Sequence, residues 1–188
     1  MSSPAASAQL PAAEAATPAR TVVHKFGGTS VADAERYRHV AQLLLAREEA
    51  LQVTVVSAMK GVTDALIELA RMAGAEAVAG QGGADWRERW HALRARHRGA
   101  AVALLGEHAG PTVEWLDQRF EELAQLLSAL GVIGGLPAEV LERVQGLGEV
   151  CSAQLLGEHL RALGQECAVL DAREVLVVGH GELGVNVD

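Results

Sequence analysis

The sequence predicts an α/β protein built as a three-layer sandwich around a mainly parallel sheet. Two short β-branched runs, 21–26 and 53–57, are separated by a segment with helical periodicity. This order and spacing are typical of a strand–helix–strand crossover between parallel strands. A glycine loop follows the first run, and ligands of open α/β sheets collect at the carboxyl ends of strands. The fold class therefore also indicates where a site is expected.

The first strand leads into a predicted helix. Val40, Leu43 and Leu44 share one face at helical spacing, and charged residues occupy the opposite face. Several residues from Thr29 to Asp33 are able to cap the first turn of this helix.

The second strand and the rest of the chain extend the same pattern. The run 53–57 is continuously apolar, which suits a strand that is buried on both faces of a parallel sheet. Further strands are expected at 167–170 and 175–178, and the glycine-rich residues 74–84 are expected to form a mobile loop. Helices are predicted at 63–72, 85–108, 111–130 and 137–163, with Pro111 in a first turn and Gly164 just past the last helix.

Composition and charge exclude several classes of function. The 188 residues are 49% hydrophobic, and the net charge is -8, with 24 acidic and 16 basic residues. An acidic chain of this kind is not expected to bind nucleic acid, which requires clustered Lys and Arg. The arginine-rich stretch 87–98 also carries Glu88 and periodic apolar residues, so it is interpreted as the mixed surface of a helix. No run of 18 apolar residues is present, and no membrane span is expected.

Two cysteines and the N-terminal segment complete the domain assignment. Cys151 and Cys167 lack the spacing of a metal site, and inert thiols in a reduced cytoplasmic protein are the favoured interpretation. Residues 1–20 are rich in Ala, Ser and Pro and lack the features of a secretion signal, so they are expected to form a disordered leader. Residues 21–188 are then expected to form the folded part.

The loop that follows the first strand is the leading candidate for a phosphate site. Gly27 and Gly28 let the backbone approach a phosphate closely, and turn N–H groups followed by a helix N-terminus favour an anion. Lys25 is able to supply a full positive charge, and Thr29 and Ser30 are able to donate hydroxyl hydrogen bonds. The pattern is not a Walker P-loop, because the lysine precedes the glycines. From the residues alone, a tight strand–helix turn with a solvated lysine is an equal alternative.

A family resemblance favours the phosphate site. Residues 25–33, with the sequence KFGGTSVAD, resemble the opening signature of aspartokinases, which are amino-acid kinases. The resemblance implies that Lys25 and the glycine loop stabilise the transferring phosphoryl group of ATP, and that Ser30 serves the substrate end of the site. Residues 55–64 resemble the second strand and loop of the same family, in which a threonine, here Thr63, contacts aspartate. In isolation, a helix cap is the favoured interpretation of Thr63.

A third family match lies in the last long helix. Gly148 and Glu149, with Ser152 downstream, resemble a segment in which the carboxylate pairs with the ammonium group of aspartate. Gly148 inside a helix costs about 1 kcal/mol relative to Ala, which indicates close approach by a ligand or a neighbouring element. In isolation, a solvated helix charge is the favoured interpretation of Glu149. Leu147 departs from the family, in which Arg or His is common, and Asp171 matches a family position but also suits an ordinary turn.

The resemblance implies a phosphoryl transfer from ATP, with Mg²⁺, to the side-chain carboxylate of L-aspartate, giving 4-phospho-L-aspartate on the pathways to lysine and threonine. The intact enzyme is expected to be a homo-oligomer, while the composition and the cysteines predict a cytoplasmic protein with no metal site of its own and no nucleic-acid or membrane partner. Residues 21–188 would be the N-terminal part of a truncated kinase domain that is inactive alone. The chain also resembles bifunctional proteins that join this kinase to homoserine dehydrogenase or diaminopimelate decarboxylase, of which the decarboxylase fusion is favoured. A non-catalytic binding or assembly unit and a kinase for another small acid are the alternatives.

Overall fold

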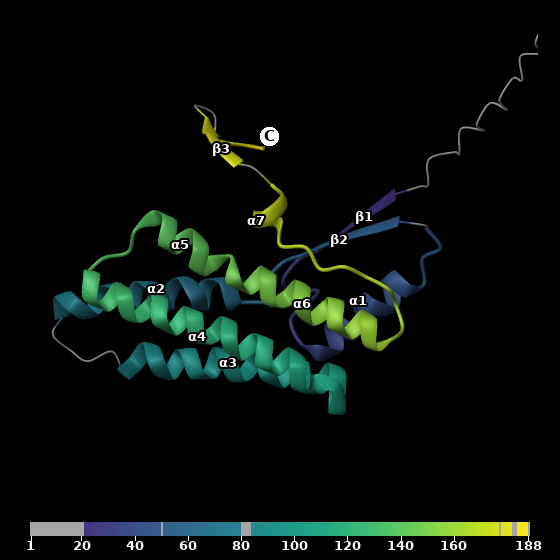
Figure 1. Ribbon diagram of the computed structural model, residues 1–188, viewed down its shortest axis with the longest axis horizontal. Helices are drawn as coiled ribbons and strands as arrows, with labels where there is room; N and C mark the ends of the chain where they lie inside the picture. The colour runs from purple at the N-terminus through teal and green to yellow at the C-terminus, as the bar shows by residue number, and fades with distance from the viewer. Residues whose placement is uncertain (1–20, 50, 80–83, 177, 182–183, 188) are drawn as a thin grey trace, which may run out of the picture.

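The computed structural model describes residues 21–49, 51–79, 84–176, 178–181 and 184–187. The predicted leader, 1–20, lies outside the described residues. The strands are β1 (Thr21–Phe26), β2 (Leu51–Val56), β3 (Val178–Gly181) and β4 (Gly184–Val187). The helices are α1 (Ala34–Leu45), α2 (Val62–Ala79), α3 (Ala84–Leu105), η1 (Gly106–Ala109), α4 (Gly110–Ile133), α5 (Ala138–Gln145), α6 (Leu147–Ala162) and α7 (Ala172–Val175). Figure 1 shows a helical body beside the β1–β2 pair, with the β3–β4 hairpin projecting away from it.

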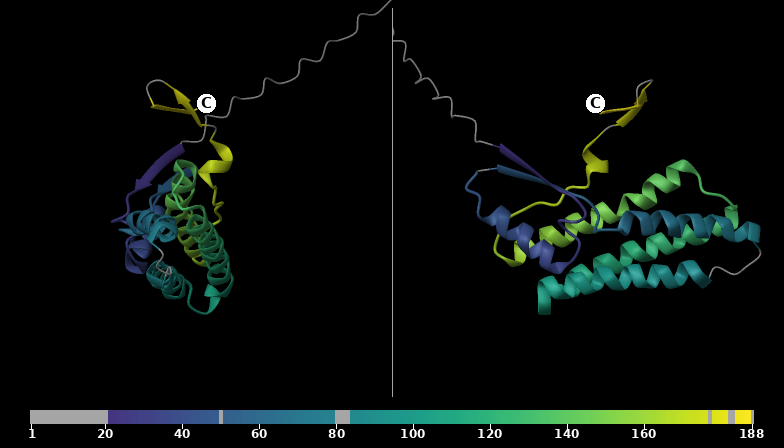
Figure 2. Two further views of the ribbon diagram at one scale, coloured as in Figure 1. Left: turned by 90° about the vertical axis from the view of Figure 1, so that its left-hand side faces the viewer. Right: turned by 180° about the vertical axis from the view of Figure 1, so that it is seen from behind.

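The β1–β2 pair confirms the predicted parallel crossover. The two strands are parallel and in register from Thr21 opposite Leu51 to Phe26 opposite Val56. Burial on both faces, as predicted for the second strand, is wrong within the described residues: Val53 is 43% exposed, and alternate residues of both strands are exposed. The reason is that the described helices lie on one side of this sheet only, with α6 packed against β2 (Figure 2). The described residues therefore supply the parallel sheet and the helical layer on one of its faces.

Helix α1 connects the two parallel strands. Its N-cap is Asp33, whose Oδ1 accepts a hydrogen bond from the Arg36 backbone N–H at 3.0 Å, which confirms the predicted capping segment. Tyr37 and Val40 lie in the core, but Leu43 is 47% exposed and does not share the buried face predicted for it. The buried stripe follows the α-helical repeat through Ala41 and Leu44 instead.

The helical body is built on α2, α3 and α4, which pack against one another. Helix α2 runs to Ala79, so the mobile loop predicted from residue 74 is wrong as far as Ala79, and residues 80–83 lie outside the described part. Gly74 is buried in this helix, where an added Cβ would lie 2.9 Å from the Gly135 carbonyl oxygen. The glycine that suggested a loop therefore serves close packing between α2 and the segment after α4.

The predicted helix over 137–163 is two helices. The break is at Gly146, which ends α5 and begins α6, and glycine is a poor helix former. The predicted end is confirmed: Gly164 has φ +84°, and its N–H donates to the Arg161 carbonyl at 2.9 Å. The next N–H, that of Gln165, donates to the Leu160 carbonyl at 3.0 Å, which completes a Schellman motif.

Two predicted strands near the C-terminus are wrong. Residues 167–170 form no strand, because they pack on α6 rather than beside another strand. Val169 covers Gly157, where an added Cβ would lie 2.3 Å from its Cγ2, and the Arg161 Nε donates to the Cys167 carbonyl at 3.1 Å. The expected strand at 175–178 is divided between the end of α7 and the start of β3, with residue 177 outside the described part. The observed β3–β4 pair is antiparallel.

Candidate active site

The lysine–glycine loop lies at the carboxyl end of β1. The Ser30 backbone N–H donates to the Gly27 carbonyl at 2.8 Å and closes a turn. The Lys25 Nζ lies 3.8 Å from the position that a Cβ on Gly27 would occupy, so the ammonium group folds over the loop. Asp33 then begins α1, which points the helix N-terminus toward the same loop. The loop thus combines a cation, a glycine turn and a helix N-terminus, as an anion site requires.

The loop after β2 packs directly against this glycine loop. An added Cβ on Gly28 would lie 2.9 Å from the Ala58 carbonyl oxygen and 3.5 Å from the Lys60 backbone. The two strand ends are also joined by the Ser57 N–H, which donates to the Phe26 carbonyl at 3.0 Å. Only a residue without a Cβ fits at position 28, because the atoms it meets are backbone atoms.

Helix α6 meets the same loop from another direction. An added Cβ on Gly148 would lie 2.7 Å from the Ala58 Cβ and 2.9 Å from Val62 Cγ1. The close approach predicted from the cost of Gly148 is confirmed, and the neighbouring segment is the loop after β2 with the start of α2. The three segments that carry the family motifs therefore converge at Ala58, which touches both Gly28 and Gly148. Leu147 is half-buried and packs against the core.

Thr63 and Glu149 directly follow the two residues in contact, Val62 and Gly148. Thr63 is the second residue of α2, and the Gly61 carbonyl accepts the first helical hydrogen bond, from Ala65 N–H at 3.1 Å. Gly61, not Thr63, therefore holds the cap position, and the capping alternative is wrong. The Glu149 Oε2 atom is buried and has no hydrogen-bond partner among the described residues. A buried carboxylate oxygen without a partner is costly unless a ligand pairs with it.

A buried hydroxyl pair ties α1 to α6. The Tyr37 Oη and Ser152 Oγ lie 2.7 Å apart in the core. Burial raises the pKa of the Tyr37 phenol well above its usual value, so the group stays neutral. This pair links the helix that follows the glycine loop to the helix that carries Glu149. Tyr37 carries no signal in the sequence, because no spacing rule connects residues 115 positions apart.

Asp171 and two histidines, His24 and His159, contact other parts of the fold and have structural roles. Asp171 caps α7, accepting from the Arg173 backbone N–H at 3.0 Å, and its hydrogen bond with the Arg173 side chain lowers the pKa of the carboxyl. The turn-forming alternative for Asp171 therefore explains it. His24 lies on β1, and its ring stacks on Phe26 with centroids 6.3 Å apart. Burial lowers the pKa of His159 on α6, whose Nδ1 atom has no hydrogen-bond partner among the described residues.

Neither cysteine carries the features of a reactive thiol. Cys151 is fully buried on α6, and burial raises the pKa of its thiol to about 12, so it is not a ready nucleophile. Cys167 is half-buried, and its thiol donates to the Gly157 carbonyl at 3.5 Å. Both are free thiols.

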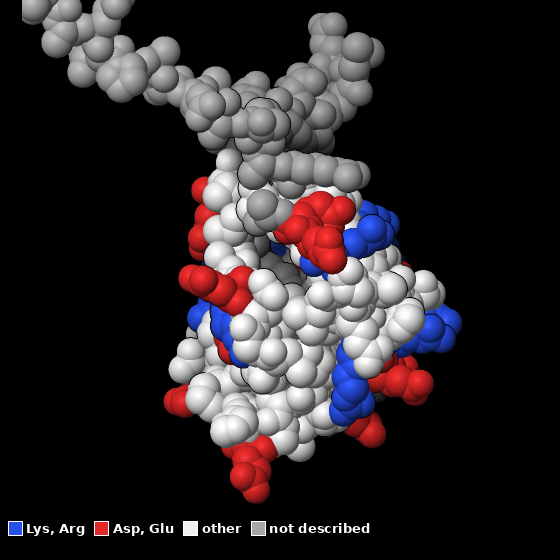
Figure 3. Space-filling model, turned by 90° about the vertical axis from the view of Figure 1, so that its right-hand side faces the viewer, with Lys and Arg blue, Asp and Glu red and all other residues white. Residues whose placement is uncertain are grey.

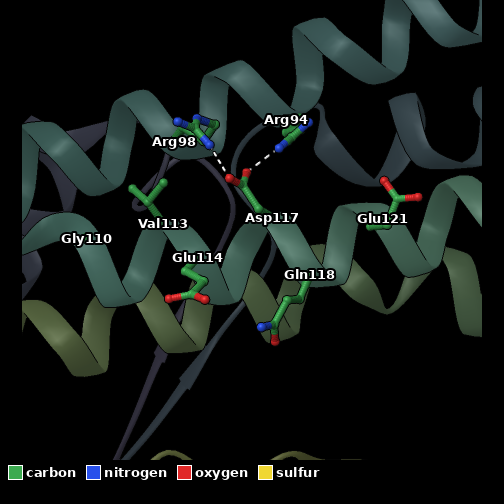
Figure 4. Close-up of a pocket in the computed structure, with 8 residues that line it drawn as sticks. All are labelled: Arg94, Arg98, Gly110, Val113, Glu114, Asp117, Gln118 and Glu121. Carbon is green, nitrogen blue, oxygen red and sulfur yellow. Dashed lines mark hydrogen bonds and ion pairs between the residues drawn. The ribbon is translucent and has the colours of Figure 1, made fainter.

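Two surface hollows lie among the helices of the body. One, of about 460 Å³, lies between α3 and α4, where Asp117 pairs with Arg94 at 2.8 Å and with Arg98 (Figure 4). The hydrogen bond from Arg94 lowers the pKa of the Asp117 carboxyl. The other hollow, of about 300 Å³, lies between α2 and α3. Neither is lined by a residue of the predicted site, and the first is an ion-pair network at the surface.

Charged side chains are scattered over the face drawn in Figure 3. Acidic and basic side chains lie there among uncharged ones, and no extended basic patch is seen on that face. Among the described residues, no cluster of three or more His, Cys, Asp or Glu is able to hold a metal ion. Among the described helices, none combines the length and apolar character that crossing a membrane requires.

Comparisons with known proteins agree with this arrangement. Residues 20–186 match the amino acid kinase family. The chain belongs to the amino acid kinase family. Among curated relatives, the bifunctional aspartokinase/homoserine dehydrogenase 1 of Arabidopsis thaliana is 33% identical over 157 residues, covering 83% of this chain and 17% of its own length. Aspartokinase 3 of the same plant is 32% identical over 165 residues, covering 84% of this chain and 27% of the relative. Both are chloroplastic proteins.

Solved amino acid kinases share the fold. The structure is similar to E. coli aspartokinase III in complex with aspartate and ADP, with a TM-score of 0.71 and 26% identity over 84% of this chain and 32% of that chain. The same enzyme in complex with lysine and aspartate gives a TM-score of 0.66 and 25% identity, over 78% and 30% of the two chains. The chain thus spans less than a third of the length of the curated relatives given above.

Proposed function

We propose that this chain supplies the lysine–glycine loop and the aspartate-binding residues of an aspartokinase. The reaction transfers the terminal phosphoryl group of ATP to the side-chain carboxylate of L-aspartate, giving 4-phospho-L-aspartate and ADP. The observation that carries this proposal is the convergence of three motif segments at Ala58, through Gly28 and Gly148. The similarity to aspartokinases, one of them bound to aspartate and ADP, supports the choice of substrates.

The lysine–glycine loop serves the phosphate. The Lys25 ammonium, which folds over Gly27, neutralises charge on the transferring group, and the backbone of Gly27 and Gly28 approaches it closely. Thr29 and Ser30 offer hydroxyl donors at the same loop, and Ser30 lies toward the substrate. The attacking carboxylate of aspartate is already ionised at neutral pH, so no strong base is required. Catalysis then consists mainly of positioning and charge stabilisation.

Thr63 and Glu149 serve the aspartate. The unpartnered Oε2 atom of Glu149 accepts a hydrogen bond from the substrate ammonium group, which removes the cost of burying that oxygen alone. The Thr63 hydroxyl, on the first turn of α2, donates to a substrate carboxylate. Both residues adjoin the Ala58 junction, so the acceptor is held beside the phosphate loop.

Magnesium enters as the MgATP complex. The described residues bring together no three metal-ligating side chains, and Mg²⁺ is commonly held by substrate phosphates with few protein ligands. Its positive charge adds to that of Lys25 on the phosphates.

Residues 21–188 are proposed to be the N-terminal part of the kinase domain, and the 188-residue chain alone is proposed to lack activity. Phosphoryl transfer requires nucleotide, metal and acceptor to be held together, and positioning alone is worth roughly 7–11 kcal/mol. The assembled enzyme is proposed to be a homo-oligomer on the pathways to lysine and threonine. A cytoplasmic location suits its two free thiols. Formation of aspartyl hydroxamate by the purified 188-residue chain from ATP, aspartate and hydroxylamine would contradict the proposed inactivity.

The proposed function is tested by the substrate choice of the intact enzyme, which means the longer protein whose kinase domain begins with residues 21–188. ADP release that requires L-aspartate, with at least tenfold lower kcat/KM for glutamate and N-acetylglutamate, is the expected result. Turnover of another acid in preference to aspartate would favour the kinase for a different small acid. ADP release that no acid stimulates would favour a binding or assembly unit.

A further inference from the structure

Arg96 joins the two loops of the candidate site from outside. It lies on α3, and its Nη2 donates one hydrogen bond to the Ala32 carbonyl at 3.1 Å and another to the Lys60 carbonyl at 3.0 Å. Ala32 belongs to the loop after β1, and Lys60 belongs to the loop after β2. A single guanidinium nitrogen therefore spans the two segments that carry the phosphate and aspartate residues.

The chemistry of this bridge suits arginine. The Nη2 nitrogen carries two N–H groups in one plane at a fixed angle, so it is able to serve two carbonyl oxygens at once. Arg96 also lines the hollow of about 300 Å³ between α2 and α3, together with Leu69 and Leu93. An apolar wall of this kind supports the methylene stem of arginine and limits its rotamers.

The bridge adds a third connection between the loops. At the strand ends, Ser57 N–H bonds the Phe26 carbonyl, and Gly28 packs against Ala58. Both of these contacts lie at the start of the first loop, close to β1. Arg96 holds the far end of that loop, at Ala32, just before the Asp33 cap of α1. With both ends of the loop tied to the second loop, the spacing between them is fixed.

We propose that Arg96 is a positioning residue that sets the distance between the phosphate loop, residues 27–33, and the loop of residues 57–61, which leads into α2 and Thr63. The effect of Arg96 on catalysis rests on the proposed function. The hydrogen-bond bridge between the two loops does not depend on that function. Because Arg96→Met removes none of the proposed ligand-binding groups on the first loop, α2 and α6, loss of the bridge leaves binding of either ligand nearly intact. It lowers the rate of transfer between them, since a misplacement of about 1 Å is able to cost on the order of 10²-fold in rate.

Hydrogen–deuterium exchange of the full 188-residue chain tests the bridge. In Arg96→Met, which keeps a long apolar stem, peptides covering 27–33 and 57–62 are expected to exchange about threefold to tenfold faster, while α4 is unchanged. Arg96→Lys, whose ammonium still has several donors, is expected to restore part of the protection. Arg38→Met is the matched control, because Arg38 also bonds a backbone carbonyl across helices, that of Ala103, away from both loops. Equal exchange in the wild-type and Arg96→Met loops, or faster exchange throughout the molecule, would overturn the bridge.

Steady-state kinetics of the intact enzyme test its consequence. Arg96→Met is expected to lower kcat about 10-fold to 100-fold, with less than a threefold change in the Kd of aspartate or of a non-hydrolysable ATP analogue. Faster exchange of both loops in Arg96→Met with an unchanged kcat would overturn the positioning role. An inactive wild-type enzyme would instead overturn the proposed function, and the exchange data would still decide whether the bridge exists.

Discussion

The carboxyl end of the parallel sheet and the α3–α4 pair hold their elements together in different ways. At the sheet end, Gly28 and Gly148 bring bare backbone against Ala58, with no room for a Cβ. Between α3 and α4, large side chains make the contact: the Trp90 indole N–H donates to the Phe120 carbonyl at 2.9 Å, and the two rings meet edge to face. Close backbone approach favours a ligand site, whereas interlocked aromatic side chains favour stability. Substitutions in the first region should therefore alter catalysis, and those in the second should alter unfolding.

The largest effect is expected from Lys25→Met in the intact enzyme. Loss of the charge over Gly27 should lower kcat about 10²-fold to 10³-fold, with a much smaller rise in the KM for aspartate, because the charge acts most in the transition state. Lys25→Arg, which retains the charge, should lose less. Arg71→Met on the exposed side of α2 serves as the control. A change in kcat below threefold for Lys25→Met would remove this residue from the mechanism.

The α3–α4 pair should lose stability most strongly in acid. His97 is 1% exposed on α3, its ring lies 5.0 Å from that of Phe120, and burial lowers its pKa to about 4. Because the unfolded chain has a higher histidine pKa, near 6.5, it binds more protons between pH 6.5 and 4, and stability falls as pH falls through this window. The shift corresponds to roughly 3 kcal/mol at the acid end.

Urea unfolding at several pH values between 7 and 4 checks this expectation. His97→Leu should flatten part of the pH dependence, while the exposed His39→Leu on α1 should not. His159 contributes in the same direction, because burial lowers its pKa as well. An unchanged slope in His97→Leu would show that the acid response arises elsewhere.

Gly148→Ala separates packing from helix propensity. The new Cβ would meet Ala58 at 2.7 Å, so α6 must shift, at a cost of about 1–3 kcal/mol that outweighs the helical preference for alanine. Aspartate affinity should fall with it. Gly99→Ala on α3 is the matched control, because an added Cβ there meets nothing within 4 Å, and stability should rise by up to about 1 kcal/mol. Thermal unfolding of the two variants should thus shift in opposite directions, and a stabilised Gly148→Ala would disprove the tight junction.

The smallest effect is expected from Asp117→Asn between α3 and α4. Its pairs with Arg94 and Arg98 are partly exposed, and such pairs contribute about 0–1 kcal/mol. The loss of stability should shrink further in high salt, and kcat should not change. A loss of activity in Asp117→Asn would mean that the hollow beside this residue takes part in function.

Sequence patterns predicted the carboxyl end of the parallel sheet better than the last part of the chain. The lysine–glycine loop, the Asp33 cap and the parallel pairing depend on local rules, and they are found as expected. Residues 167–170 have strand-like composition, but a strand requires a neighbouring ladder, and Val169 packs on Gly157 instead. Gly74 shows the same limit, since a buried helix contact and a loop both favour glycine.

The candidate site itself could be predicted only in pieces. The motifs named Lys25, Thr63 and Glu149, but their convergence depends on helix packing, which no local pattern encodes. Arg96 carries no signal at all, because it is one of several arginines on the same helix. Its role follows only from the two carbonyl oxygens that the fold brings to it.

The most direct test of the account is the effect of Glu149→Gln on the binding of two separate ligands to the intact enzyme. The lost charge-assisted hydrogen bond should weaken aspartate binding by about 1.5–3 kcal/mol, or roughly 10-fold to 100-fold, and leave the affinity for a non-hydrolysable ATP analogue within about twofold. Glu139→Gln, an exposed change on α5, should affect neither ligand. Isothermal titration with each ligand in turn gives the answer. An equal loss of affinity for both ligands, or no loss for either, would contradict the assignment of Glu149 to the aspartate ammonium group.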